Sequence, residues 1–317
     1  KISSADKTDS AVLDELRDPF EYLSCEQIGN SFRLLTKLYS ADFLGRNDLL
    51  ERNNTIFTGP RGCGKTTVFR NLSLKVSILT ESSDNLEFVG IYYQCMDLFF
   101  AFPYLYLQKD LTERGLKIAI AYFNLAILSE ILELIAILRG KGNVITAEET
   151  KNTLGKIVAK ISPTDLRIAS YNDILDVLIG WVGSRKSKLR KLKLAGEQDP
   201  NTEGIDSLDF LKNISREFAA GFSYFSNKPF YFFIDDYSSP KIPDVLQKAL
   251  NLVLFQRNAE CFFKISTESI TSIYPQDVSG KMLELSREYD VIDLGGYFLN
   301  SADDVKKEFI TEIVNNR

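Results

Sequence analysis

The sequence of this chain predicts an α/β fold in which helices cover both faces of a parallel sheet. Residues 59–66 form a Gly-x-x-x-x-Gly-Lys-Thr run between an apolar strand-like segment and a helical pattern. Residues 229–234 form an apolar, aromatic run that ends in two aspartates. Strand-like runs alternate with helical segments, which is the order that builds a parallel sheet. The predicted strands are 54–58, 87–93, 229–234, 260–266 and 290–294.

The first element is a polar, helical segment over residues 1–50. Ser10 is a suitable N-cap for a first helix, and the stretch from Phe32 to Tyr39 has the apolar face of a second. Helical segments ahead of a first strand often pack over a nucleotide base. No residue in this segment can be assigned to such a contact from the sequence.

A phosphate-binding loop follows the strand over 54–58. Its glycines allow backbone N–H groups to turn toward a polyphosphate, and the helix predicted over 66–79 adds partial positive charge. Lys65 would reach the β- and γ-phosphates and the Thr66 hydroxyl would hold Mg²⁺. The alternative is a glycine-rich turn with a surface lysine, which the strand before and the helix after disfavour. The nucleotide-binding residues are Gly59, Pro60, Arg61, Gly62, Cys63, Gly64, Lys65, Thr66 and Thr67.

A long helical insertion is predicted between the second and third strands. The gap is about 135 residues, whereas a crossover needs only a dozen or so. Its most apolar part, Ile118–Leu138, carries two glutamates and two other polar residues, so we interpret it as a buried helix and not as a membrane span. The helices predicted here cover 116–138, a segment capped by Thr146 and Glu149, a segment from Ser170 and Asp173 past Trp181, and 206–220.

A basic cluster lies within this insertion. Six of the nine residues over 185–193 are lysine or arginine. The commoner explanation is a solvated helix face or a helix C-terminus. The alternative is contact with nucleic acid or an acidic partner, and this contact would be salt-sensitive and made to the phosphate backbone because no aromatic residues are interleaved.

The third strand delivers two acids in the form of a Walker B motif. A buried parallel strand places the residues that follow it at the carboxyl edge of the sheet. Asp235 would bind Mg²⁺ through water, and Asp236 stands where a second acid orients the attacking water. An aspartate reaches about one methylene less than a glutamate would at this position, which predicts slow hydrolysis. The alternative is an ordinary core strand followed by an Asp-rich turn.

Two further residues are candidates for catalysis. Thr267, or its neighbour Ser266, could bond the γ-phosphate or the lytic water from the end of the fourth strand, although a strand-end cap is an equal alternative. Arg287 precedes the fifth strand and could neutralise transition-state charge on a neighbouring subunit's nucleotide. Its alternative is an exposed surface arginine.

The composition excludes several kinds of catalytic and metal site. The chain has 317 residues, 44% of them apolar, and a net charge of −5, which gives no overall attraction to nucleic acid. It has no histidine, which excludes histidine-based triads and histidine metal ligands. The cysteines Cys25, Cys63, Cys95 and Cys261 form no C-x-x-C pair, so a reducing, cytoplasmic location is expected. Because the chain begins at Lys1, we expect it to be part of a longer protein.

These motifs together resemble the AAA+ ATPases. The resemblance is carried by the loop Gly59–Thr67, by the Ile-Asp-Asp end of the third strand, and by the Phe-Lys-Ile-Ser-Thr run over 263–267. It is closest to the bacterial branch similar to the origin-recognition-complex ATPases, which grades into the STAND-type signalling ATPases. It covers residues 30–95 and 229–317.

The resemblance implies a sheet in the order 5-1-4-3-2, with ATP and Mg²⁺ as ligands. It also implies a homo-oligomer, a ring or similar, whose subunits share nucleotide at their interfaces. Bacterial members often act in antiphage defence, as sensors or as scaffolds for an effector protein. This chain departs from the pattern in its long insertion and in a C-terminal lid reduced to one helix, so no second sensor arginine can be assigned.

The sequence therefore predicts an oligomeric ATPase that acts as a sensor or scaffold module. Two alternatives stay open: a non-hydrolysing, ATP-dependent assembly switch, which Asp236 in place of glutamate favours, and a DNA-binding initiator or loader, which only the 185–193 cluster supports. The predicted parts are an N-terminal segment (1–50), a nucleotide-binding core (51–100 and 229–298), a helical insertion (101–228) and the start of a lid (299–317).

Overall fold

The computed structural model describes residue 35 and residues 45–80, 87–103, 109–141, 144–161, 174–191, 202–239 and 241–315, with side chains up to residue 311. Most of the predicted N-terminal segment, including Ser10, lies outside the described residues. Leu35 is buried, and its carbonyl accepts a hydrogen bond from the Asn71 side chain.

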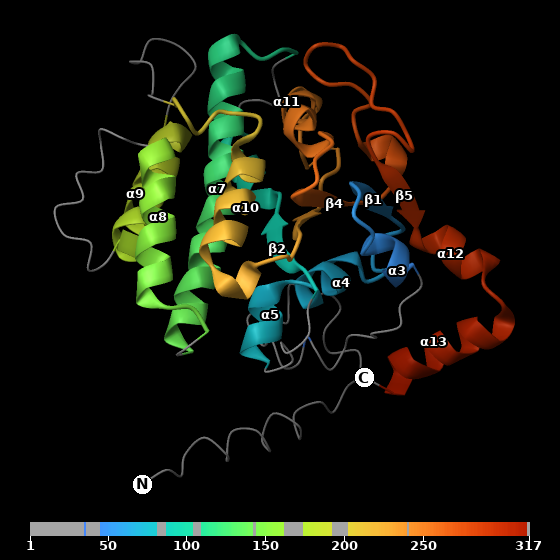
Figure 1. The fold of residues 1–317 in the computed structure, drawn as a ribbon. Helices are drawn as coiled ribbons and strands as arrows, with labels where there is room; N and C mark the ends of the chain where they lie inside the picture. The colour runs from blue at the N-terminus through green and yellow to red at the C-terminus, as the bar shows by residue number, and fades with distance from the viewer. Residues whose placement is uncertain are drawn as a thin grey trace, which may run out of the picture.

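Within the described residues, the sheet has five parallel strands in the order β2-β3-β4-β1-β5 (Figure 1). Read from the other edge, this is the predicted order 5-1-4-3-2, which is confirmed. Every predicted strand is present, and no end differs from its predicted position by more than two residues. The strands are β1 (Thr55–Thr58), β2 (Val89–Gln94), β3 (Phe230–Asp235), β4 (Cys261–Thr267) and β5 (Asp290–Asp293).

Alternate side chains of the strands enter two separate cores, one on each face of the sheet. In β3, Tyr231 and Phe233 belong to the smaller core, whereas Phe230, Phe232 and Ile234 belong to the larger one. All six residues of β3 are buried. A strand buried on both faces requires helices on both sides of the sheet. The helices of the described residues are α3 (Arg46–Leu49), α4 (Lys65–Asn71), α5 (Leu74–Leu79), α6 (Met96–Ala101), α7 (Glu113–Gly140), α8 (Ala147–Ile161), α9 (Ile174–Lys191), α10 (Phe210–Gly221), α11 (Asp244–Leu254), α12 (Leu294–Asn300) and α13 (Asp303–Asn315).

The segment over 66–79 is two helices, not the one that its apolar pattern predicts. The chain breaks between α4 and α5, where Ser73 donates a hydrogen bond to the Arg70 carbonyl at 2.6 Å. The break brings the Leu72 carbonyl against the backbone of Gly90 in β2. A Cβ at Gly90 would lie 2.2 Å from that oxygen, so only glycine fits. The close approach lets α5 pack along the edge strand.

The long helix α7 covers the sheet directly. It packs against β2, α5, α9 and α11, and its buried side chains belong to the same core as Phe230 and Phe232 (Figure 1). Among the described helices, α7 is the one long and apolar enough to cross a membrane, but 83% of its most apolar window is buried inside the protein. The predicted buried helix is therefore confirmed, and it extends over Glu113–Gly140.

The other helices of the 101–228 region form a layer with α7, beside the β2 edge (Figure 1). The predicted capping box is present, since the Thr146 hydroxyl accepts from the Glu149 N–H at 3.1 Å and Glu149 accepts from the Thr146 N–H at 2.7 Å. Helix α9 is described from Ile174, so its predicted start at Ser170 lies outside the described residues. The division into core, insertion and lid stays a prediction.

Candidate functional site

The glycine-rich loop is shaped as an anion cradle. It leaves the carboxyl end of β1 and leads into α4. Gly62 and Gly64 have φ angles of 85° and 91°, a left-handed conformation that glycine adopts without strain. A Cβ at either position would meet no atom within 4 Å, so open space lies beside the loop. The loop therefore fits a phosphate group held by backbone N–H donors.

Lys65 folds back over this loop. Its ammonium group donates to the carbonyls of Gly59 at 2.6 Å and Pro60 at 3.1 Å, and lies 3.5 Å from the Cys63 sulfur. Only 9% of the residue is exposed. Neutral carbonyls are weaker partners for an ammonium group than phosphate oxygens, so an arriving polyphosphate would compete for this lysine.

Asp235 ends β3 directly beside the start of α4. Its carboxylate is fully buried and accepts from three hydroxyls: Thr66, Ser266 and, at 2.9 Å, Tyr92. Burial raises the pKa of Asp235, and these hydrogen bonds oppose that rise. Thr66 and Asp235, predicted from separate motifs, are thus brought together. A hydroxyl and a carboxylate in contact are the oxygen donors that Mg²⁺ takes, so the residues fit the predicted ATP·Mg²⁺.

Asp236 has a different environment from its neighbour. Its side chain is 20% exposed and forms an ion pair with Lys241, whose Nζ lies 2.8 Å from Oδ1. Its backbone is in the left-handed region, at φ 63°, which is uncommon for a residue other than glycine. The sequence analysis did not identify Lys241, and nothing in the local pattern singles out one lysine in the turn after a strand.

The two residues predicted as candidates for the sensor, both at the end of β4, make different contacts. The Thr267 hydroxyl donates to the Ser269 carbonyl at 3.1 Å, as a strand-end cap would. Ser266 instead donates to Asp235 and accepts from the Asp236 N–H at 3.0 Å. Of the two hydroxyls, Ser266 is therefore the one in contact with the paired acids.

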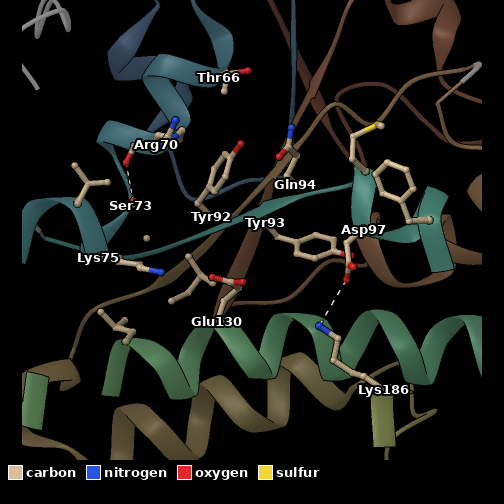
Figure 2. A pocket seen from close by; sticks show the side chains of 16 residues that line it. Thr66, Arg70, Ser73, Lys75, Tyr92, Tyr93, Gln94, Asp97, Glu130 and Lys186 are labelled. Atoms are coloured by element: carbon tan, nitrogen blue, oxygen red, sulfur yellow. Dashed lines mark hydrogen bonds and ion pairs between the residues drawn. The ribbon is translucent and has the colours of Figure 1, made fainter. Parts of the chain in front are cut away.

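A cavity of about 660 Å³ opens beside the free edge of β2 (Figure 2). Thr66 lies at one end, and the ion pair of Asp97 with Lys186, 3.6 Å long, lies at the other. Glu130 enters it from α7, and burial raises the pKa of that carboxyl. The sequence could not predict this cavity, because it forms between segments that are far apart in the chain.

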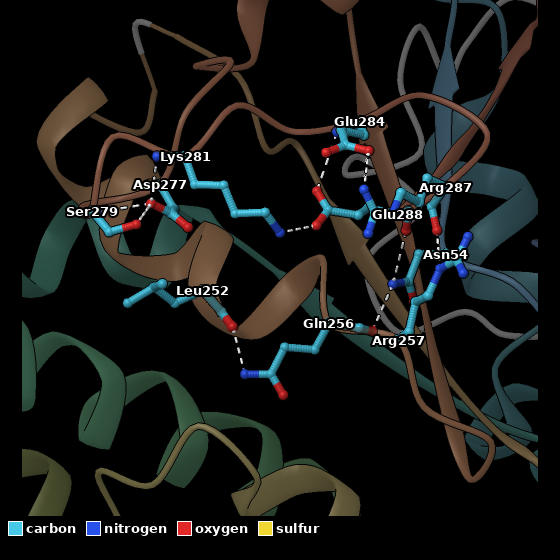
Figure 3. A network of polar contacts seen from close by, with 10 residues as sticks. All are labelled: Asn54, Leu252, Gln256, Arg257, Asp277, Ser279, Lys281, Glu284, Arg287 and Glu288. Carbon is cyan, nitrogen blue, oxygen red and sulfur yellow. Dashed lines mark hydrogen bonds and ion pairs between the residues drawn. The ribbon is translucent and has the colours of Figure 1, made fainter.

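Arg287 lies at the amino ends of the strands, whereas the phosphate loop lies at their carboxyl ends. It precedes β5, whose first residue pairs with Thr55 at the start of β1, whereas the loop follows the end of β1. Its side chain is 67% exposed and pairs with Glu284 at 2.7 Å (Figure 3). The structure therefore does not bring Arg287 together with Lys65 or Asp235 within one subunit.

The surroundings of Arg287 are rich in arginine. A hollow of about 260 Å³ there is lined by Arg52, Arg257 and Arg287, by the acids Glu288 and Asp290, and by several asparagines. Arg257 also donates from Nε to the Arg287 carbonyl, and the Asn54 side chain donates to the Glu288 carbonyl at 3.2 Å (Figure 3). The sequence analysis missed Arg52 and Arg257, which are 205 residues apart and meet only through the strand order.

The basic cluster is divided by the packing of α9. Lys186 and Arg190 both pair with Asp97, and Arg190, whose side chain is 43% exposed, also donates to the Tyr122 hydroxyl at 2.6 Å. Arg185 lies over the Trp181 ring. Lys193 lies outside the described residues. Two residues of the cluster therefore anchor the end of α9 to Asp97.

A sequence model of the family described as ORC-CDC6-like matches residues 20–317 of this chain. No curated protein and no solved structure matches it.

Proposed function

Because this chain belongs to the ORC-CDC6-like family, and is thereby related to the AAA+ ATPases, we propose that it binds ATP with Mg²⁺ and hydrolyses it slowly as an oligomer. One observation carries the proposal. An open glycine cradle, the Lys65 ammonium and the Thr66–Asp235 contact converge at the carboxyl edge of the sheet. This combination supplies backbone donors, a cation and metal ligands for a polyphosphate.

Arg287 supports a shared active site. The four-residue strand β5 spans about 13 Å, and Arg287 stands at its far end from the phosphate loop of its own subunit, so a role for Arg287 in hydrolysis requires the nucleotide of a neighbouring subunit. We assign Arg287 the role of stabilising transition-state charge in trans, with Asp236 orienting water and a hydroxyl of β4, Thr267 or Ser266, sensing the phosphate.

We further propose that the oligomer is a cytoplasmic sensor or scaffold that presents an effector protein in bacterial antiphage defence. This role rests on the resemblance to the bacterial branch of the family and not on a contact in the structure. The alternative of a non-hydrolysing assembly switch is favoured by one observation, the pairing of Asp236 with Lys241. The alternative of a DNA loader gains little from α9, because Lys186 and Arg190 are paired with Asp97.

The test combines assembly with turnover. Particle size is measured by light scattering with and without ATP·Mg²⁺, alongside phosphate release. The proposal expects a larger particle with ATP·Mg²⁺ and slow release of phosphate. Assembly without phosphate release would select the switch, and a particle that neither binds ATP nor changes size would refute the proposal.

The substitution Lys65→Ala tests whether the loop over residues 59–66 binds phosphate. The substitution removes a charge-assisted contact worth about 2–3 kcal/mol, so ATP affinity should fall about 30–150-fold. Calorimetry measures the affinity, and the thermal unfolding midpoint serves as the control for folding. Unchanged affinity would show that the loop does not bind phosphate.

A further inference from the structure

The outer edge of β2 is open to the cavity shown in Figure 2. Among the described residues, β2 is an end strand of the sheet and pairs with β3 alone. The N–H groups of Val89 and Cys95 donate toward β3, at N···O distances of 2.9 and 3.0 Å. Because the backbone groups of a parallel strand alternate in direction, the N–H and C=O groups of Gly90 and Gln94 point away from β3. Such an edge can pair with a further strand.

The cavity follows this edge. Residues 90–94 all line it, and five residues of strand span about 17 Å. Helices α4 and α5 contribute Arg70 and Lys75 to its wall, and α7 contributes Glu130 and Leu134. Its volume of about 660 Å³ lies within the range of ligand-binding cavities, about 300–1,000 Å³. The cavity is therefore long and large enough for a short extended segment.

Glu130 is a carboxylate without a close partner in this cavity. Figure 2 shows it between α7 and β2, and burial raises its pKa. No hydrogen bond or ion pair joins the carboxylate to another described residue. Of the two lysines that oppose the rise in pKa, Lys75 is paired with Glu133 at 2.7 Å. The other, Lys186, is paired with Asp97 at 3.6 Å. The Glu130 carboxylate is therefore available to a cation that enters the cavity.

These features together describe one kind of occupant. A basic side chain would offset the cost of keeping Glu130 charged while it is partly buried. Phe100, which is 68% exposed, adds an apolar contact at the wall of the cavity. The outward backbone groups of β2 favour a peptide over a small organic cation, which would leave them unpaired.

We propose that the cavity beside β2 binds an extended segment of a partner protein, which pairs with the outer edge of β2 and places a lysine or arginine side chain against Glu130. This pairing uses neither Lys65 nor the paired acids at the end of β3. The inference therefore goes beyond the proposed ATPase function, and it assigns a place and a chemistry to a protein partner.

The test selects phage-displayed random heptapeptides on the full chain without nucleotide. The enriched peptides should share a lysine or arginine at one position, and calorimetry measures the affinity of a synthetic copy. Glu130→Gln should lower this affinity about tenfold or more, because it keeps the shape of the side chain and removes a charge-assisted contact. The matched control is Glu113→Gln, at an exposed position of the same helix, which should stay within about twofold of wild type. The thermal unfolding midpoint checks the folding of both variants.

Strand pairing has a signature of its own. Methylation of single backbone nitrogens in the peptide should weaken binding at alternate positions, because only every second N–H of the added strand faces β2. A selection that enriches no basic peptide, or an affinity that Glu130→Gln leaves unchanged, would overturn the proposal. Dependence on Glu130 without the alternation would show a site for an organic cation and would overturn strand pairing.

Calorimetry with ATP separates this inference from the proposed function. A chain that binds ATP but no basic peptide would overturn the partner site alone. A chain that binds the peptide through Glu130 but does not bind ATP would overturn the proposed function and leave the partner site standing.

Discussion

At the scale of single residues, two adjacent acids differ in what surrounds them. Asp235 is fully buried among three hydroxyls, and Asp236 is partly exposed beside a lysine. The buried carboxylate suits a metal, whose charge would offset the cost of burial. The partly exposed carboxylate of Asp236 suits a group that exchanges one hydrogen-bond partner for another. Substitution of the two acids should therefore have different effects.

Asp235→Asn should weaken Mg²⁺-dependent ATP binding by about 10–100-fold, because it removes the charge next to Thr66. Asp236→Asn should leave binding intact and slow turnover by a factor on the order of 10². Calorimetry with and without Mg²⁺ and a phosphate-release assay measure the two effects. Wild-type turnover in Asp236→Asn would exclude Asp236 as the acid that orients water.

Lys264 is a fully buried lysine in β4. Its ammonium donates to the carbonyls of Glu51 and Asn53, both at 2.8 Å, and to the Thr55 hydroxyl at 2.9 Å. Burial lowers its pKa from 10.5 to about 7, and the nearby acids Glu51 and Asp290 oppose that change. The oxygen partners also favour the charged form of Lys264. Desolvation outweighs them, and the pKa therefore falls.

The shift predicts a pH dependence of stability. Between pH 7 and pH 10.5 the unfolded chain binds more protons than the folded one at this site, so the free energy of unfolding should rise with pH across that window. The Lys264 contribution is about 2 kcal/mol between pH 7 and 9. Urea unfolding of wild type and Lys264→Met measures it, and the slope should be smaller in the variant. Equal slopes would contradict the shift.

At the scale of elements, the break between α4 and α5 depends on one glycine in a neighbouring strand. Gly90→Ala would place a Cβ 2.2 Å from the Leu72 carbonyl and should destabilise the protein by about 1–3 kcal/mol. The matched control is Gly180→Ala in α9, where a Cβ meets no atom within 4 Å and helix propensity should add about 0.5–1 kcal/mol. Chemical denaturation measures both, and equal effects would show that the contact at Gly90 is relaxed easily.

Sequence reasoning predicted the elements whose signals are local and missed what depends on distant contacts. The glycine loop, the capping box at Thr146 and the strand ending in Asp235 each carry their signal within a few residues. The helix break does not, because the close approach that accompanies it involves Gly90 in the distant strand β2. The Tyr92–Asp235 hydrogen bond joins residues 143 positions apart and was likewise not predictable.

At the scale of the whole molecule, the two edges of the sheet carry opposite halves of the proposed active site. The phosphate loop lies at the carboxyl edge and Arg287 at the amino edge. Arg287→Ala alone should bind ATP normally and lower the hydrolysis rate on the order of 10³-fold or more if it acts as an arginine finger. Phosphate release by the assembled variant measures the loss.

A mixture decides whether the site is shared. Subunits with Arg287→Ala and subunits with Asp236→Asn lack different halves, so a mixed interface can rebuild one complete site and recover part of the activity. Wild-type subunits mixed with each variant calibrate the recovery. Mixtures that co-assemble without any recovery would place Arg287 outside a trans mechanism.

The buried helix α7 also has a consequence for synthesis on the ribosome. Its covering elements are split along the chain, with β2 before it and α9 and α11 after it. About a hundred residues separate the end of α7 from the end of α11, and at 5–20 residues per second they take on the order of 10 s to be made. During that interval an apolar helix emerges with only part of its surface covered. We therefore expect chaperones to bind the nascent chain. The yield of folded protein should depend on the delay between the synthesis of α7 and the synthesis of the elements that cover it.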